Sequence, residues 1–212
     1  MILHRIVNDI DDKLPQAPFV RPNGSLLMMV GLPGTGKSFV VESIASQLAC
    51  VVISTDNIRL QMRRQPTYTA AELVLVYEVC YALIEARLRR GQRVVFDATN
   101  YLAARRQQVM SLAKRVGAPV AVCYVQASQA IIRQRMRQRA SKERHETDLS
   151  DADWSVYQWM VETQEPVMVD HIVIDNTDAS ADELGEKLAA YWLDVEASAS
   201  SEFDIQPPGW SG

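Results

Sequence analysis

A glycine-rich segment of eight residues, Gly31 to Ser38, has the residue types and spacing of a loop that binds phosphate. In the pattern Gly-x-x-x-x-Gly-Lys-Ser, main-chain amides surround the phosphates, the lysine reaches the terminal oxygens and the serine ligates Mg²⁺. An apolar run, residues 25–30, leads into the segment, and we expect a helix over 37–48, whose N-terminus adds partial positive charge. We predict that ATP binds through these residues: Gly31, Pro33, Gly34, Thr35, Gly36, Lys37, Ser38 and Phe39.

A carboxylate at the end of another apolar strand, Asp97, is the candidate partner of Ser38 at the metal. It follows Val94-Val95-Phe96, and a carboxylate in that place holds a metal-bound water or orients the acceptor of the phosphate. The alternative is a helix cap, because Asp97 begins an Asp-Ala-Thr-Asn segment before a predicted helix. We predict Mg²⁺ ligation by Ser38 and Asp97.

Asp56 follows the predicted strand 51–54 and is the candidate general base, because a carboxylate there can accept the proton of a substrate hydroxyl. Arg59 lies three residues later, so on a helix the two side chains share a face and together can grip a substrate. The alternative is an N-capping aspartate followed by a solvated arginine. Farther along, Thr99, Asn100, Arg105 and Arg106 are expected to line the site of the acceptor.

Four arginines alternate along a predicted helix that begins after Ser128. Arg135 and Arg139 are four residues apart, as are Arg133 and Arg137, so the two pairs occupy different faces; we expect one pair to neutralise charge on the phosphates and the other to be solvated. The polar segment about 135–153 is expected to act as a lid. The alternative is a soluble basic helix.

Apolar runs alternate with helix-like segments along the chain, which predicts an α/β fold with a parallel sheet covered on both faces. Polar residues follow the first three strands, and ligands of such sheets bind at the carboxyl ends of the strands. We expect strands at 25–30, 51–54, 93–97, 120–125 and 171–174, and helices at 37–48, 69–90, 102–116, 128–139, 153–164 and from 180 onward. The predicted domains are an arm over 1–24, one domain over 25–196 and a loose tail over 197–212.

Composition restricts the classes of partner. The 212 residues carry a net charge of −4, which argues against broad, non-specific binding of nucleic acid. Three cysteines without metal-binding spacing indicate reduced thiols, and the sequence has neither a long apolar run nor the pattern of a signal peptide. We therefore expect a cytoplasmic protein that does not enter a membrane.

The chain resembles the family of P-loop kinases that includes polynucleotide 5′-hydroxyl kinase. The resemblance rests on the phosphate-binding pattern (a Walker A motif), the pair Asp56-x-x-Arg59, the segment 97–100 with Arg105-Arg106, and the arginine-bearing helix. The resemblance spans roughly 25–176 and implies a three-layer sandwich with strand order 2-3-1-4-5 and a helical lid. It also implies that Asp56 is the general base, that Arg59 contacts the acceptor, and that Arg135 or Arg139 contacts the phosphates. Residues 96–100 are similar to the kinase half of 6-phosphofructo-2-kinase, and zeta-toxin-like relatives phosphorylate amino sugars.

We therefore predict an AAA-family, ATP- and Mg²⁺-dependent kinase that phosphorylates a hydroxyl of a small molecule or of a nucleic-acid 5′ end. The small molecule is slightly favoured, because the acidic balance provides no broad basic groove. The alternative is an ATPase or nucleotide-dependent switch that acts on a protein partner. That reading needs a residue that positions water for attack, and the Asp56/Arg59 pair fits an acceptor better.

Overall fold

The computed structural model describes residues 2–62, 67, 69–140 and 153–201. Five strands form one parallel sheet in the order β2-β3-β1-β4-β5, which confirms the predicted fold class and strand order. The strands are β1 (Ser25–Val30), β2 (Val51–Ser54), β3 (Arg93–Asp97), β4 (Val120–Gln126) and β5 (Ile172–Asp175).

The strand register brings the polar residues that follow β1, β2 and β3 to one edge of the sheet. Met28 pairs with Phe96, and Ser54 pairs with Asp97. The carboxyl ends of β1, β2 and β3 therefore lie side by side, and the loop 31–38 and Asp56 begin beside Asp97.

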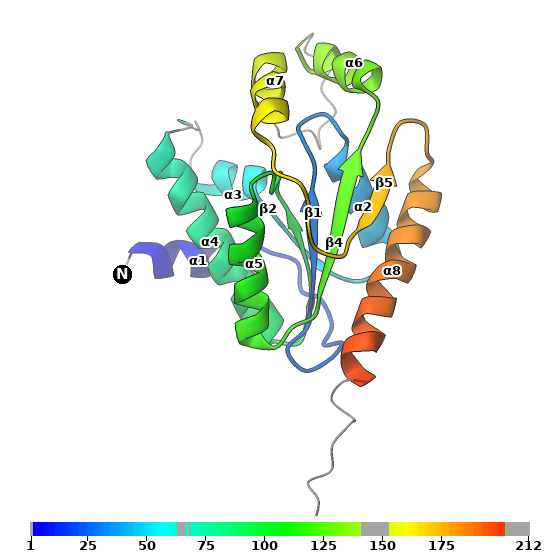
Figure 1. The fold of residues 1–212 in the computed structure, drawn as a ribbon. Coiled ribbons are helices and arrows are strands. Elements are labelled where there is room, and N and C mark those ends of the chain that lie inside the picture. The colour runs from blue at the N-terminus through cyan, green and yellow to red at the C-terminus, as the bar shows by residue number, and fades with distance from the viewer. Residues whose placement is uncertain (1, 63–66, 68, 141–152, 202–212) are drawn as a thin grey trace, which may run out of the picture.

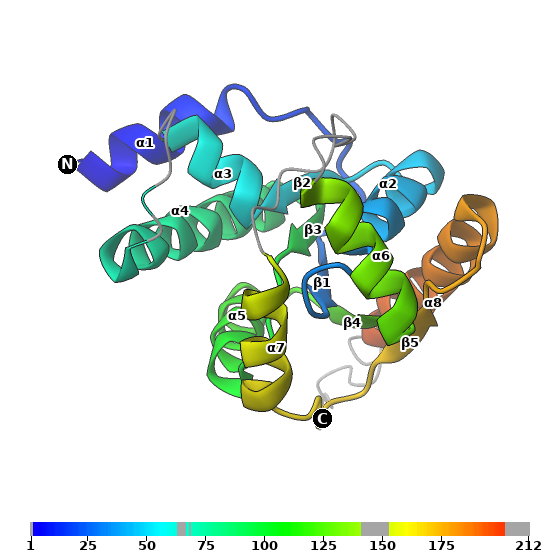
Figure 2. The same ribbon diagram turned by 90° about the horizontal axis from the view of Figure 1, so that it is seen from above.

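The central strand β1 is buried on both faces because helices cover both. Leu26 and Met28 face one helical layer, Leu27 and Met29 face the other, and all four are fully buried. The first layer contains α1 (Ile2–Asp11), α3 (Thr55–Met62), α4 (Ala70–Arg89) and α5 (Ala103–Val116), and the second contains α2 (Lys37–Gln47) and α8 (Ala181–Ser201) (Figures 1 and 2). The result is the expected three-layer sandwich.

Two further helices, α6 (Gln129–Ala140) and α7 (Trp154–Thr163), lie above the carboxyl edge of the sheet (Figure 1). Ile132 and Met136 of α6 and Tyr157 of α7 pack on Leu32 of the glycine-rich loop. Residues 135–140 of the predicted lid therefore belong to α6, and 141–152 lie outside the described residues.

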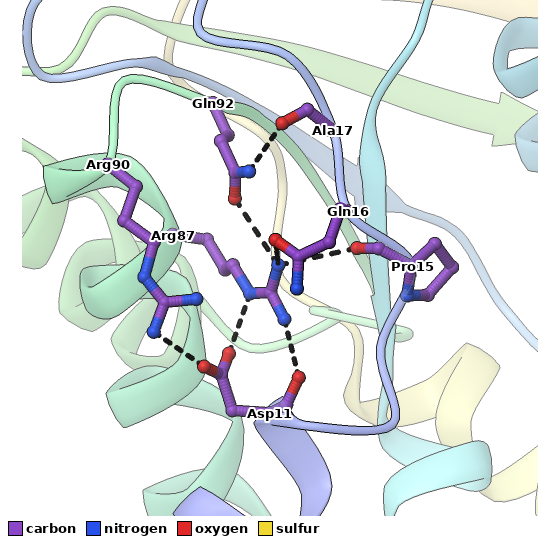
Figure 3. Close-up of polar contacts among 7 residues, drawn as sticks. All are labelled: Asp11, Pro15, Gln16, Ala17, Arg87, Arg90 and Gln92. Atoms are coloured by element: carbon purple, nitrogen blue, oxygen red, sulfur yellow. Dashed lines mark hydrogen bonds and ion pairs between the residues drawn. The ribbon is translucent and has the colours of Figure 1, made fainter.

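The predicted N-terminal arm contains a helix, α1, that the sequence analysis did not anticipate. Its apolar residues, Leu3, Ile6, Val7 and Ile10, contact the core. The arm is fastened by Arg87 of α4, which is fully buried (Figure 3). Arg87 Nε donates to Asp11 Oδ1 at 2.6 Å, and its other nitrogens donate to the carbonyl oxygens of Asp11 and Pro15.

The C-terminal helix α8 continues to Ser201, past the predicted domain end at 196, and residues 202–212 of the predicted tail lie outside the described residues. Over the part of the chain that the structure describes, no helix combines the length and the apolar character needed to cross a membrane.

Candidate active site

The glycine-rich loop between β1 and α2 folds tightly around its own main chain. Thr35 donates to the carbonyl oxygen of Leu32 from both its amide (3.3 Å) and its hydroxyl (2.9 Å), and Lys37 Nζ donates to the same oxygen at 3.2 Å. Gly34 and Gly36 have φ values of 83° and 86°, which side chains disfavour. A Cβ at Gly36 would lie 2.1 Å from Asn176 Nδ2, so this turn requires glycine.

Two side chains hold this loop from its carbonyl side. Arg135 of α6 donates to the carbonyl oxygens of Thr35 (3.1 Å) and Asn176 (2.9 Å), and Asn176 Nδ2 donates to Thr35 O at 3.0 Å. These contacts engage carbonyl oxygens of the loop, and the binding of phosphate by its amides stays a prediction. Sequence reasoning missed Asn176, because an asparagine directly after a strand has many uses and its place after β5 is a weak signal. The contact of Arg135 with phosphate stays a prediction.

Ser38 and Asp97 meet where Mg²⁺ was predicted. Ser38 Oγ donates to Asp97 Oδ2 at 3.5 Å, and Asp97 is buried. Burial, and secondarily the nearby Asp56 carboxylate, raise the pKa of Asp97, while Lys37 and Ser38 act in the opposite direction. A buried carboxylate whose charge is incompletely balanced fits a cation, which would restore that balance.

The donor set fits Mg²⁺ rather than a metal held by many side chains. Among the residues that the structure describes, no group of three or more histidine, cysteine or acidic side chains could hold a metal ion. Mg²⁺ usually takes one or two protein oxygens and completes its shell with phosphate oxygens and water. Ser38 and Asp97 can supply those protein contacts, a hydroxyl directly and a carboxylate directly or through water.

Asp56 in the first turn and Arg59 in the last turn of α3 lie together on one face of this helix, which the sequence analysis had not listed. Arg59 Nη1 donates to Asp56 Oδ1 at 3.0 Å, so the predicted pairing on one helical face is present. Arg59 also forms an ion pair with Glu72 of α4, at 3.1 Å from Nε to Oε1. Glu72 lies in the first turn of α4, and its contact with Arg59 had no sequence signal.

The segment after β3 fastens the glycine-rich loop to the sheet. The amide of Gly31 donates to the carbonyl oxygen of Thr99 at 3.0 Å, and Asn100 Nδ2 donates to that of Met29 at 2.8 Å. Asn100 is fully buried, so the structure places it behind the loop rather than at a surface that an acceptor reaches. Thr99 is half-buried, and its contact with an acceptor stays a prediction.

The two adjacent arginines of α5 differ in their surroundings. Arg105 lies over the ring of Tyr77, with its guanidinium carbon 4.2 Å from the ring centroid. Arg106 is buried and donates to main-chain carbonyl oxygens, among them those of Asn100 and Pro166. Burial lowers the pKa of Arg106, and the carbonyl contacts make it a structural brace between α5 and the segment after α7.

The remaining predicted site residues differ in their exposure and in their contacts. Pro33 is buried in the loop, and Phe39 on α2 is partly exposed. Arg133, a member of one of the two arginine pairs, lies over the ring of Trp154, with its guanidinium carbon 4.7 Å from the ring centroid, and so joins α6 to α7. Arg139 belongs to α6, and its side chain lies outside the described structure.

A model of a known family, described as an AAA domain (AAA_33), matches residues 26–166, from the first strand to the end of α7. The chain belongs to this AAA-domain family. The match includes the glycine-rich loop, Asp56 and Asp97, and it ends before Asn176.

Solved structures share the fold of this AAA domain. The APS kinase CysC of Mycobacterium tuberculosis, in complex with AMPPNP and APS, is similar with a TM-score of 0.62 and 17% identity, over 84% of this chain and 99% of that one. A gluconokinase from Sinorhizobium meliloti 1021 is similar with a TM-score of 0.57 and 21% identity, over 88% of this chain and 100% of that one. Kti12 of Chaetomium thermophilum, in complex with ADP-AlF3, is similar with a TM-score of 0.59 and 20% identity, over 79% of this chain and 98% of that one.

The geometry of this AAA domain combines the parts that phosphoryl transfer needs. A loop of amides with Lys37, a hydroxyl–carboxylate pair for a metal, and a second carboxylate lie at one edge of one sheet. Asp56 lies close enough to Asp97 for its charge to raise the pKa of that residue. The two acids are therefore neighbours with different surroundings: Asp97 is buried, and the Asp56 side chain is 35% exposed.

Proposed function

We propose that this protein is a kinase that transfers the γ-phosphate of ATP to a hydroxyl group, with Mg²⁺ as cofactor. The observation that carries the proposal is the position of Asp56, a partly exposed carboxylate beside Asp97 and across from the phosphate loop. A switch or ATPase would need a residue that positions water for attack, whereas the paired Asp56 and Arg59 suit a hydroxyl acceptor better. The shared fold with an APS kinase and a gluconokinase supports the same activity.

Each residue has a role that follows from its place. The amides of the loop 31–38 bind the phosphates, and Lys37, once it exchanges its contact with Leu32 for phosphate oxygen, balances their charge. Ser38 and Asp97 hold Mg²⁺, which supplies positive charge over the phosphates when it is bound. Asp56 orients the acceptor hydroxyl and accepts its proton at a carboxylate oxygen.

We infer that the acceptor is a small molecule in preference to a nucleic-acid 5′ end. The net charge of −4 disfavours a polyanion, and Arg59 and Arg106, two of the arginines expected near the acceptor, are engaged with protein groups. Neighbours of the same fold include kinases whose names indicate small acceptors.

The proposal is tested by measuring ADP release with Mg·ATP and a panel of hydroxyl acceptors: sugars, nucleosides, aminoglycosides and oligonucleotides with 5′-hydroxyl ends. We expect turnover that depends on one class of acceptor, and Asp56→Asn should lower kcat by roughly 10²-fold or more while the affinity for ATP stays within about twofold. Asp194→Asn, on the exposed face of α8, is the matched control. Acceptor-independent turnover, or equal losses of kcat and ATP affinity in Asp56→Asn, would contradict the proposal.

A further inference from the structure

Arg59 lies between two carboxylates that differ in exposure. Its Nη1 contacts Asp56 Oδ1 at 3.0 Å and its Nε contacts Glu72 Oε1 at 3.1 Å. The side chain of Glu72 is 3% exposed, that of Arg59 is 10% exposed and that of Asp56 is 35% exposed. The two contacts therefore connect a buried glutamate in the first turn of α4, through Arg59, to the partly exposed Asp56 of the candidate active site.

Glu72 is itself held by the start of α4. Its Oε2 accepts from the amide of Thr67 at 2.7 Å and from the Thr67 hydroxyl at 2.5 Å, while its own amide donates to Thr69 Oγ1 at 3.2 Å. In the usual capping box the glutamate returns to the amide of the capping residue, here Thr69. Glu72 places Oε2 against Thr67, two residues before the capping residue, and Oε1 against Arg59.

The cost of burying a charge explains why this contact is maintained. An ionised side chain that is nearly excluded from water is stable only when it is paired and hydrogen-bonded. Glu72 meets that condition through Thr67 and Arg59, so Arg59 is restrained at its Nε end. Because the guanidinium group is planar and rigid, this contact also restrains Arg59 Nη1, and Nη1 in turn restrains the Asp56 carboxylate.

We propose that Glu72 is a positioning residue that holds Arg59 and, through it, sets the orientation of the Asp56 carboxylate toward the acceptor. This inference rests on the proposed function, in which Asp56 receives the proton of the acceptor. It gives Arg59 a task inside the protein, and it predicts that Glu72 matters for turnover although it touches neither ATP nor acceptor. Precise orientation of a reacting group contributes to rate without changing the affinity for the other substrate.

Glu72→Gln is the sharpest variant, because glutamine keeps an oxygen for Thr67 and removes only the charge that faces Arg59. Glu85→Gln is its matched control, since Glu85 is a glutamate of the same helix that pairs with Arg89 and Arg115 away from the site. Thr69→Ala weakens the helix cap and leaves the three charges in place, so it reports the effect of a purely structural loss.

The first measurement is the exchange of the Arg59 Nε proton with water, by NMR of the full chain. We expect exchange to be at least about tenfold faster in Glu72→Gln, because an ion pair worth 1.4 kcal/mol corresponds to that factor. Exchange should be unchanged in Glu85→Gln and Thr69→Ala. An Arg59 signal that is insensitive to Glu72→Gln would overturn the inference.

The second measurement is a double-mutant cycle on ADP release from Mg·ATP, with the panel of sugars, nucleosides, aminoglycosides and 5′-hydroxyl oligonucleotides as the probe acceptors. Glu72→Gln should lower kcat about tenfold with the KM for ATP unchanged, and the same substitution in Asp56→Asn protein should have almost no effect, because the group it positions is gone. Equal losses in both backgrounds would show a structural role and overturn the inference. Wild-type protein without turnover on any acceptor of the panel, or Asp56→Asn with full turnover, would instead remove the proposed function.

Discussion

At the level of single residues, the buried carboxylate of Asp97 lowers the stability of the fold when no cation is bound beside it. Its pKa is raised, mainly by burial, so the folded protein binds a proton at this carboxylate more tightly than the unfolded chain does. The ionised form therefore destabilises the fold at neutral pH, and this penalty disappears as pH falls through the raised pKa. A bound cation would offset the same penalty.

Asp97→Asn should accordingly raise the thermal midpoint of the ligand-free protein at pH 7, because it removes the buried charge and keeps an oxygen for Ser38. The gain should shrink as pH is lowered toward the raised pKa. The same variant should weaken Mg·ATP binding by about tenfold or more. Calorimetric unfolding at two pH values, together with titration of Mg·ATP, checks both effects; a variant that is less stable at pH 7 would contradict this account of Asp97.

Lys37 is the cation expected to balance the phosphates. Lys37→Ala should lower turnover by roughly 10²- to 10³-fold, the usual loss when one group that stabilises developing charge is removed. Steady-state kinetics with Mg·ATP and an acceptor would measure it. Lys114→Ala on the exposed surface of α5 serves as the control, and a Lys37→Ala enzyme with more than a third of normal turnover would rule out this role.

Among single residues, the sequence was informative where one residue type has one task. Gly36, Lys37 and Ser38 could be placed from their pattern, because a phosphate loop admits few alternatives at those positions. Asn176 and Glu72 could not, since each acts through a contact with a distant segment, and an asparagine after a strand or a glutamate in a helix cap has many uses. Asn100 was expected to line the site of the acceptor, and it is fully buried.

At the level of elements, the fastening of the N-terminal arm is the least expected feature. Arg87 is fully buried in α4 and contacts Asp11, Pro15 and Gln16 of the arm, while Arg90 shares Asp11 (Figure 3). The arm carries α1, which packs against α3 and α4 on the side of the sheet that holds Asp56. The arm therefore stabilises the layer that carries the acceptor carboxylate.

Arg87→Met should lower the free energy of unfolding by about 3 kcal/mol, because a buried pair loses its cation and Asp11 keeps only the more exposed Arg90. Urea unfolding would measure the loss. Arg89→Met is the matched control, since Arg89 is exposed and its pair with Glu85 is worth less than about 1 kcal/mol. Equal effects of the two substitutions would mean that the buried network contributes no more to the free energy of unfolding than the exposed pair does.

The elements that sequence reasoning found and those it missed differ for physical reasons. Strands such as β1 and β3 are continuous apolar runs because both of their faces are buried, so they were readily predicted. The helix α1 was missed although Leu3, Ile6, Val7 and Ile10 follow a helical period, because the prolines and glycine of residues 15–24 suggested an extended arm. The short α3 has only eight residues, too few to give a clear period.

At the scale of the whole molecule, the strand order determines why distant residues can act together. Because β3 lies between β1 and β2 in a parallel sheet, the segments that follow all three strands emerge at one edge. This arrangement brings together the loop 31–38, Asp56 and Asp97, which lie up to 66 positions apart in the sequence. Alternation of strands and helices predicted the parallel sheet, whereas its strand order came from the family resemblance, since composition and periodicity do not specify which strands are neighbours.

The most direct test of the central claim is to follow the γ-phosphate of labelled ATP and identify the molecule that carries it after incubation with the protein, Mg²⁺ and the acceptor panel. The kinase account predicts that the label appears as a phosphate ester of one acceptor class, and that Asp56→Asn slows formation of this ester by roughly 10²-fold or more while Mg·ATP still binds. Label found only as inorganic phosphate, at a rate indifferent to every acceptor, would contradict it.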